Sequence, residues 1–153
     1  MTPASLTLLS VGYERLPIVN ELIDALVAAG VERVVDVRDL PQSRRPGFSR
    51  RALESSLADA GIVYEHRREL GNPRAIRALS RAGEAARGRQ EYRAQLLGER
   101  AWALDALADA VAERPTAMLC LEADQARCHR DVIAEELARL HPAIRVEPLG
   151  AGG

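Results

Sequence analysis

Short apolar runs alternate with longer amphipathic stretches along the whole 153-residue chain. The runs are rich in Val, Leu and Ile, which is typical of strands buried on both faces. The longer stretches repeat apolar residues every three to four positions, which predicts helices with one buried face. Strands are expected at 6–11, 34–37, 62–65, 116–121 and 145–148, and helices at 18–29, 50–60 and 132–140, with two more between 71 and 114.

Local signals mark several helix ends. Gly30 and Gly61 follow two expected helices in the position where glycine commonly ends a helix. Ser49 is the expected N-cap of the helix at 50–60, with Phe48 and Leu53 at the spacing of a hydrophobic staple. In the long stretch 71–114, Asn72 and Pro73 are expected to start one helix, the region 83–88 to break the pattern, and a second helix to cover 90–112.

The alternation of strand and helix predicts an α/β fold, a single doubly wound domain with a mostly parallel five-stranded sheet and helices on both faces. No repeat or linker divides the chain, so one domain is expected over residues 1–149, with 150–153 as a flexible tail. The chain start lacks the pattern of a signal peptide, and no apolar run approaches the roughly 20 residues of a membrane span. A cytoplasmic protein without membrane contact is expected.

The net charge of −1 hides an uneven distribution. Residues 33–100 hold 15 arginines and 9 acidic residues, the remaining residues hold 6 and 13, and the chain has no lysine. Each guanidinium offers a planar fork to a carboxylate or phosphate. The basic middle of the chain favours an anionic partner, either a phosphorylated ligand or nucleic acid, although codon bias also produces arginine without lysine.

Polar residues follow each expected strand. In a parallel sheet the carboxyl ends share one edge, where ligands bind, so side chains distant in sequence are expected to converge there. Tyr13 follows the first strand and His66 the third, and both are candidate ligand-binding residues. Asp36 and Arg38 lie on one side of the second strand. They are candidates too, and we expect them to form an ion pair, since an acid in an apolar strand is costly without a partner.

The segment Cys120-Leu-Glu-Ala-Asp-Gln-Ala-Arg-Cys-His-Arg130 joins a buried strand to a helix start and carries the richest chemistry. Glu122, Cys128 and His129 are the candidate catalytic residues, and Arg130 is a candidate anion ligand. A helix N-terminus and a nearby arginine favour a reactive Cys128 thiolate, although packing of the helix start also explains a small residue there. His129 is either a general base or ligand group, or a structural hydrogen-bond donor. Cys120, inside the strand, is expected to be buried and unreactive.

The loop at 41–51 supplies further candidates for phosphate binding. Ser43, Arg44 and Arg45 lie between two prolines and a glycine, and guanidinium forks on a stiff loop suit phosphate, although solvated surface arginines are the alternative. We expect Arg38, Arg44 and Arg130 to meet in one cleft. The two cysteines give no disulfide framework, and the Cys and His residues lack paired metal-ligand spacing, so neither a metal nor a cofactor is expected.

Four segments resemble, in this order, the domain of unknown function 488 family: Ser10-Val-Gly-Tyr13, Asp36-Val-Arg-Asp-Leu-Pro-Gln-Ser-Arg44, Glu69-Leu-Gly-Asn-Pro-Arg74 and Cys120-Leu-Glu through Cys128-His-Arg130. The resemblance spans nearly the whole chain and implies a compact α/β fold without an established activity. The chain departs from the family at Tyr13 and Glu147, where histidine is typical. A mechanism that needs either imidazole is therefore not expected here.

Three functions fit these residues. The leading hypothesis is an enzyme that binds a phosphorylated ligand, such as a nucleotide or a nucleic-acid end, at the carboxyl edge of the sheet. The second is a non-catalytic nucleic-acid-binding module that uses the basic surface of 33–100. The third is cysteine sulfur transfer, because Asp-Val-Arg after a strand and a cysteine loop before a helix are similar to rhodanese-type carriers. There the cysteine directly follows the strand, so Cys120 would be the carrier.

Overall fold

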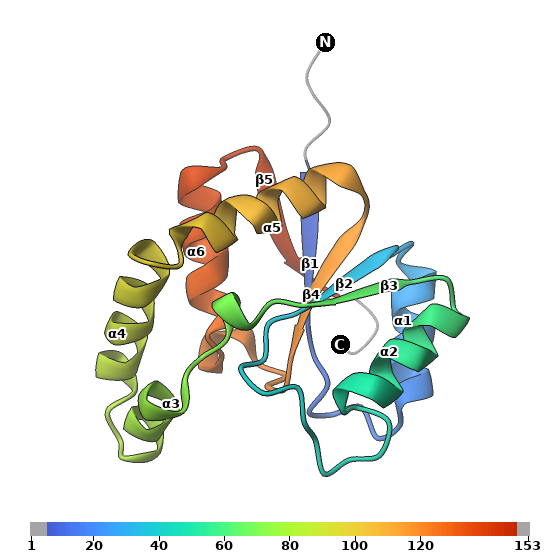
Figure 1. The fold of residues 1–153 in the computed structure, drawn as a ribbon, viewed down its shortest axis with the longest axis horizontal. Coiled ribbons are helices and arrows are strands. Elements are labelled where there is room, and N and C mark those ends of the chain that lie inside the picture. The colour runs from blue at the N-terminus through green and yellow to red at the C-terminus, as the bar shows by residue number, and fades with distance from the viewer. Residues whose placement is uncertain (1–5, 150–153) are drawn as a thin grey trace.

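The computed structural model describes residues 6–149, so the tail expected at 150–153 lies outside the described residues. Five strands form one sheet in the order β3-β2-β4-β1-β5, and every neighbouring pair is parallel. The doubly wound α/β fold is confirmed (Figure 1). The strands are β1 (Leu6–Gly12), β2 (Arg33–Asp36), β3 (Val63–His66), β4 (Thr116–Cys120) and β5 (Ile144–Pro148).

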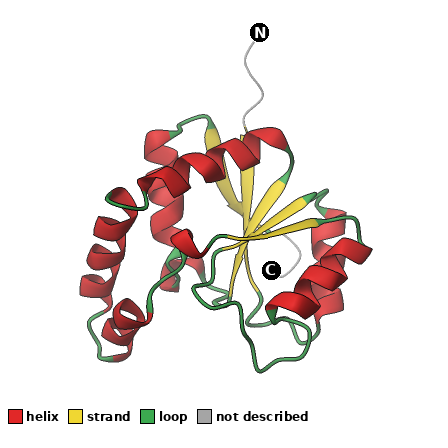
Figure 2. Cartoon of the chain, viewed as in Figure 1, coloured by secondary structure: helices red, strands yellow, loops and turns green. Residues whose placement is uncertain are grey.

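Helices cover both faces of the sheet, as expected (Figures 1 and 2). On one face lie α1 (Val19–Ala28) and α2 (Arg50–Asp59). On the other face α5 (Ala101–Glu113) and α6 (Arg130–Leu140) contact the sheet, and α3 (Arg74–Arg81) and α4 (Ala85–Leu97) pack beyond them. Single 3-10 turns, η1 (Arg68–Leu70) and η2 (Gln125–Arg127), complete the order. No helix within residues 6–149 has the length and apolar character of a membrane span.

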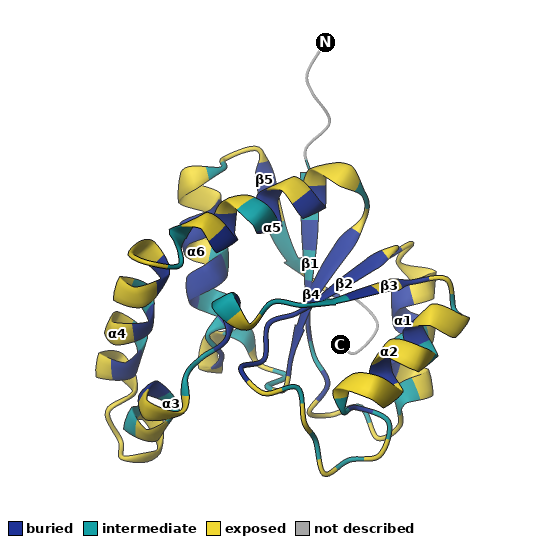
Figure 3. Ribbon diagram, viewed as in Figure 1, coloured by how far each residue is buried: buried dark blue, intermediate teal, exposed yellow. Residues whose placement is uncertain are grey.

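Period-2 alternation along the central strand divides the core in two. All five residues of β4 are buried (Figure 3). Ala117 and Leu119 join the core under α1 and α2, whereas Met118 and Cys120 join the core under α5 and α6. Successive side chains of a strand point to opposite faces, so a continuous apolar run is what a strand covered on both sides requires.

The stretch 71–114 differs from the expectation. It holds three helices instead of two, because the chain breaks between α4 and α5 at Gly98 and Arg100. Gly83, with a φ of 84°, separates α3 from α4. Gly88 lies inside α4, where an added Cβ would be 3.3 Å from the carbonyl oxygen of Ile76, so its small size lets α3 and α4 approach closely.

The expected helix ends are partly correct. Gly30 and Gly61 have φ angles of 74° and 77°, the left-handed conformation that ends α1 and α2. Ser49 is the N-cap of α2 by position, but its Oγ bonds to the backbone of Ser43 instead of the helix. The α3 helix is capped by Pro73, so Asn72 lies one residue farther out than expected.

The topology opens the sheet at the carboxyl end of β4. This strand lies between β1 and β2, whose following helices α1 and α2 pack on one face, while α6, which follows β4, packs on the other. When the chain segments that follow two neighbouring strands run to opposite faces of the sheet, a crevice forms between those segments. Open α/β sheets bind ligands in this crevice.

Candidate active site at the carboxyl end of β4

A cleft of about 340 Å³ opens at this point of the sheet. Its walls come from the segments after β1, β2 and β4 and from α3. A second pocket of about 200 Å³ adjoins the cleft beside α4. Both hollows are lined by Cys128 and His129, which therefore lie where the two meet; Asn72, Ser80 and Arg127 are also shared.

A local turn places Cys128 at the start of α6. The side chain of Asp124 accepts a 3.0 Å hydrogen bond from the backbone N–H of Ala126 and begins η2. The backbone N–H of Cys128 then donates to the carbonyl of Gln125 and closes the turn. The carbonyls of Cys128 and His129 accept the first N–H groups of α6. The thiol thus lies just before a helix N-terminus, where the positive end of the helix dipole favours a thiolate.

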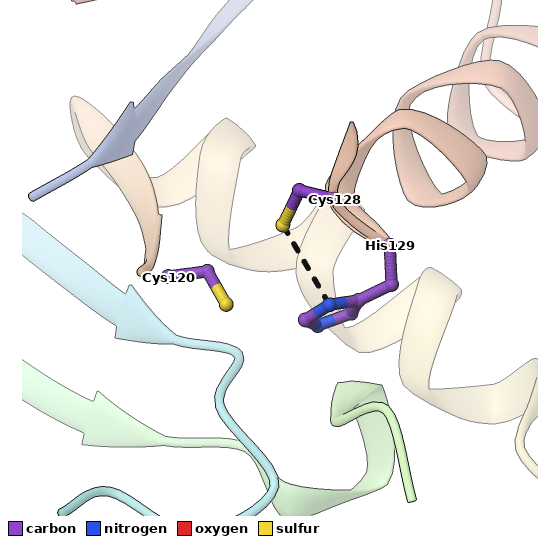
Figure 4. A group of neighbouring side chains, drawn as sticks. All are labelled: Cys120, Cys128 and His129. Carbon is purple, nitrogen blue, oxygen red and sulfur yellow. Dashed lines mark hydrogen bonds between the residues drawn. The ribbon is translucent and has the colours of Figure 1, made fainter. Parts of the chain in front are cut away.

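His129 connects this turn to β2. Its Nε2 lies 2.8 Å from the carbonyl oxygen of Val37, so this nitrogen carries the proton that the carbonyl accepts. Its Nδ1 faces Cys128, 3.7 Å from Sγ (Figure 4). The ring of Tyr92 packs edge-on against the imidazole, with 5.3 Å between centroids. The imidazole is therefore held in one orientation with Nδ1 directed at the sulfur.

The pKa values of this pair shift in opposite directions. The pKa of Cys128 falls well below that of an ordinary cysteine because the Cys120 thiol donates a hydrogen bond to it and because His129 and Arg130 add positive charge. Burial opposes a charged His129, but the hydrogen bond and negative charge of Cys128, with the Val37 carbonyl, raise the pKa of the imidazole. Both shifts favour a thiolate at Cys128 beside a protonated His129.

Cys120 and Glu122 keep their protons more firmly than usual. The pKa of Cys120 is raised by its hydrogen bond to Cys128 and by burial. The pKa of Glu122 is raised by burial and by the nearby Cys128 thiolate. The Sγ of Cys120 lies 3.6 Å from Oε2 of Glu122, and both residues line the cleft. A carboxyl group that stays protonated to higher pH is suited to donate a proton.

Arg130 occupies a different place from the one expected. It is 1% exposed and does not line the cleft. Its Nε donates to Cys128 Sγ at 3.3 Å, its Nη1 to Ser10 Oγ at 2.8 Å, and its Nη2 to the Glu122 carbonyl. The guanidinium therefore ties the loop after β4 to β1 and supports the thiolate.

The expectation that Arg38, Arg44 and Arg130 meet in one cleft is wrong, because only Arg38 lines it. Arg44 is exposed elsewhere on the loop. Arg45 donates to three backbone carbonyls of the segment after β1, so its fork is used within the protein. The loop at 41–51 is fixed by these contacts and presents no joint anion site with the other two arginines.

The ion pair expected between Asp36 and Arg38 is present. Asp36 is 0% exposed and accepts hydrogen bonds from Arg38 Nε at 2.9 Å, from Arg38 Nη2 at 2.7 Å, from the Arg38 backbone N–H at 3.1 Å and from the hydroxyl of Tyr64 at 2.5 Å. The remaining Nη1 of Arg38 donates to the carbonyl of Phe48 and the hydroxyl of Tyr13. Nearly all donors of this guanidinium are occupied, which makes the pair an anchor between β2, β3 and the loop.

The other sequence candidates are placed by internal contacts. Tyr13 borders the cleft, but it is 2% exposed and stacks on Phe48 at 4.5 Å. Ser43 donates its N–H to Ser49 and lies outside the cleft. His66 lies outside the cleft too, with Nε2 2.7 Å from the carbonyl of Arg38. Their assignment to ligand binding stays a prediction.

The family model described as Domain of unknown function DUF488 matches residues 19–137 of this chain. The chain belongs to the DUF488 family. Searches of curated proteins and of solved structures each give no match. The matched region begins at α1 and runs into α6, so it contains β4 and the loop that carries Cys128 and His129 but not the Tyr13 segment.

Sequence reasoning found Arg38 but missed three other arginines that line the cleft of this DUF488 protein. Arg77 and Arg81 come from α3, and Arg127 comes from η2. Arg81 and Arg127 are exposed, and neither forms an ion pair with a described residue; Arg77 lies 4.0 Å from Asp39. Arg127 lies in the segment 120–130 that carries the candidate catalytic residues, so its place near the cleft could have been predicted. Arg81 was not recognisable, because its place depends on how α3 packs.

The DUF488 site also contains a set of metal-binding atoms. The donor atoms of Cys120, Cys128 and His129 all lie within 4.8 Å of one another. Cysteine sulfur and imidazole nitrogen are ligand types that zinc binds, although Cys120 would have to lose its proton to become one of them. Sequence spacing gave no sign of this set, because Cys120 reaches it from the end of β4 and the other two from the start of α6.

Proposed function

We propose that this protein is an enzyme that binds a phosphorylated small molecule, such as a nucleotide, and attacks it with the Cys128 thiolate. The observation that carries the proposal is the 3.7 Å contact between Cys128 Sγ and His129 Nδ1 beside a cleft at the carboxyl edge of a parallel sheet. A thiolate stabilised by an imidazolium at a helix N-terminus is an activated nucleophile.

The reaction proceeds in two steps through a covalent intermediate. The thiolate of Cys128 forms a bond to the electrophilic atom of the substrate as the bond to the leaving group breaks. Glu122, whose pKa is raised by burial and by the thiolate, gives its proton to the leaving group. The resulting carboxylate then takes a proton from water, the hydroxide displaces the sulfur, and the thiolate is regenerated. His129 keeps its charge throughout and stabilises the free thiolate.

The charged lining of the cleft supports an anionic ligand. Arg81 and Arg127 project from α3 and η2 without an ion-pair partner among the described residues, so their guanidinium forks are available to phosphate oxygens. The Oδ1 atom of Asn72 is buried with no protein hydrogen-bond partner, and this residue lines both hollows. A bound ligand with a hydroxyl or amine group would supply the missing donor.

The second pocket supports a flat part of the same ligand. It lies beside Cys128, where Ala85, Ala86 and Gly88 leave room for a ring and the side chains of Ser80 and Arg89 offer polar contacts. A pocket of this kind next to a cationic cleft fits a molecule with a phosphate at one end and a planar ring at the other. A nucleotide has this shape and charge.

The basic stretch at 33–100 gives less support to a nucleic-acid-binding module. Ion pairs with acidic side chains occupy eight of its fifteen arginines, which reduces the positive surface that the composition indicated. These arginines are Arg33, Arg38, Arg67, Arg68, Arg77, Arg87, Arg89 and Arg93.

Sulfur transfer is a second candidate, favoured by the thiolate character of Cys128. A persulfide carrier needs a nucleophilic sulfur, and the pKa of Cys120 is raised, so Cys128 is the better carrier. This reverses the assignment to Cys120 that the rhodanese likeness favoured.

Protection of Cys128 from alkylation tests the proposed enzyme. Its rate of modification by iodoacetamide is measured by peptide mass spectrometry with each common nucleoside monophosphate, with the matching nucleosides and with inorganic phosphate. We expect at least one nucleotide to slow the reaction about 10-fold or more at millimolar concentration, and its nucleoside or phosphate alone to protect less. An alkylation rate unchanged by all of these ligands contradicts a nucleotide-sized site around Cys128.

A further inference from the structure

The proposed enzyme mechanism uses only one of the two sulfur atoms in the site. We propose that Cys120 and Cys128 form a reversible disulfide after a hydroperoxide oxidises Cys128, so that Cys120 acts as the resolving thiol. The pair shares the Cys128 nucleophile with the proposed enzyme but needs no substrate, so the disulfide can be detected whether or not a nucleotide binds.

The geometry of the two sulfur atoms supports the pair. Their Sγ atoms lie within 4.8 Å of each other, and both residues line the cleft. Figure 4 shows Cys120 at the end of its strand, with its sulfur on the side of Cys128 and His129. These are the two cysteines of the chain, so an intramolecular disulfide has one connectivity. Closure to the S–S distance of about 2.05 Å requires the sulfurs to approach.

The segment between the cysteines can accommodate this movement. It consists of a surface loop and the single turn η2, and Leu121, Asp124, Ala126 and Arg127 within it are exposed. Cys120 itself is held by β4, whose register pairs it with Gly12. Cys128 and the turn before it must therefore move toward Cys120 for the two sulfurs to meet. Cys128 itself is buried in the core, so only a small shift is available to it, and the exposed residues of the turn before it can move with it.

The contacts of Cys128 assign it the first step, because Nδ1 of His129 lies 3.7 Å from its Sγ and Nε of Arg130 donates to it at 3.3 Å. The sulfur of Cys128 attacks one oxygen of the hydroperoxide; the O–O bond breaks, Cys128 becomes a sulfenic acid, and the other oxygen takes up a proton and leaves as an alcohol or water. The sulfur of Cys120 then attacks the sulfenic sulfur, the S–O bond breaks, and the oxygen leaves as water with the Cys120 proton. The products are one disulfide and two hydroxyl compounds from one hydroperoxide and two thiols.

The structure also provides a route back to the reduced state. Both cysteines line the 340 Å³ cleft, so a small dithiol that enters it can attack the disulfide and release both cysteines while it becomes a cyclic disulfide. In the oxidised state Cys128 is not a nucleophile. Formation of the pair thus switches the site off and prevents irreversible oxidation of Cys128 to sulfinic acid.

The direct test measures the mass of the full chain after peroxide treatment. The protein is incubated with one equivalent of hydrogen peroxide at neutral pH in buffer that contains a chelator, then denatured, alkylated without reduction and analysed by intact mass. We expect a monomer that has lost about 2 Da and takes up no alkyl group, and dithiothreitol should restore two alkylation sites. A wild-type chain whose Cys128 is oxidised to sulfinic acid while Cys120 still alkylates contradicts the proposal, as does a disulfide found only between two chains.

Two single substitutions separate the roles. Cys120→Ser should accumulate a dimedone-reactive sulfenic acid at Cys128 and proceed to sulfinic acid with further peroxide. Cys128→Ser should leave Cys120 at least about 10-fold slower to oxidise than Cys128 in the wild type, since its thiol keeps its proton. Equal oxidation rates in the two variants contradict the assigned roles. If either variant fails to fold, the mass measurement on the wild-type chain still tests whether the disulfide forms.

Discussion

The Sγ atom of Cys128 lies 3.7 Å from Nδ1 of His129. The two residues are adjacent in sequence, yet their contact is fixed from outside, because the other imidazole nitrogen is bound to the backbone carbonyl of Val37, directly after β2. Strand β2 thus orients a ring that belongs to the start of α6. This arrangement gives the site its charge-separated pair and its candidate nucleophile.

Removal of the imidazolium should make Cys128 less reactive. In His129→Gln the amide carries no positive charge, so the pKa of Cys128 should rise and the midpoint of its alkylation rate against pH should move to higher pH. The reaction is followed by peptide mass spectrometry. His141→Gln is the matched control, because His141 pairs with Asp105 outside the cleft. A loss of rate shared by both variants would point to a general effect on the fold.

Removal of the free arginines should weaken anion binding. The variants Arg81→Gln and Arg127→Gln each lose a guanidinium fork in the cleft, and we expect nucleotide affinity, measured by calorimetry, to fall about 10-fold or more in each. Arg44→Gln removes an exposed arginine outside the cleft and should bind like the wild type. If Arg44→Gln weakens binding and the two cleft variants do not, the anion binds on the 41–51 loop instead.

The fold was predictable from sequence because its signals are local. Apolar runs mark the strands, and Gly30 and Gly61 mark two helix ends with their left-handed backbone. The break between α4 and α5 was missed, because apolar spacing continues across Gly98 and only tertiary packing turns the chain there. The order of the strands also depends on long-range pairing, which the sequence pattern does not encode.

The candidate site was predictable in part. The position of Cys128 and His129 after a central strand followed from the topology of parallel sheets, as did the buried pair of Asp36 and Arg38. The path of a long side chain could not be predicted in this way. Arg130 turns inward to Ser10, a contact between residues 120 positions apart, and this single turn removes it from the expected anion site.

Arg38 should stabilise the fold strongly. In Arg38→Met the Asp36 carboxylate, which is 0% exposed, loses its charged partner. Breaking a buried ion pair by removing one member costs about 3–5 kcal/mol in free energy of unfolding, which urea denaturation measures. Arg44→Met, at an exposed position, should change this free energy by less than about 0.5 kcal/mol. Similar free energies of unfolding for the two variants would show that the ion pair of Asp36 and Arg38 does not stabilise the fold.

Gly12 should tolerate no side chain. A Cβ at this position would lie 1.7 Å from the carbonyl oxygen of Glu122 and 2.8 Å from Nη2 of Arg130. Gly12→Ala must therefore displace the loop after β4, and we expect a loss of about 1–3 kcal/mol in free energy of unfolding together with a changed alkylation rate of Cys128. If both the free energy of unfolding and the alkylation rate kept their wild-type values, the close contact of Gly12 with the loop after β4 would not be required for stability or for the site.

The pH dependence of Cys128 alkylation tests the central claim most directly. The rate follows the fraction of thiolate, so it rises with pH through the pKa of Cys128 and is constant above it. Since Cys120, His129 and Arg130 lower this pKa, the midpoint of the profile should lie well below the free-cysteine value of about 8.5. A midpoint at or above about 8.5 would show that Cys128 is an ordinary buried thiol and would contradict the proposed nucleophile.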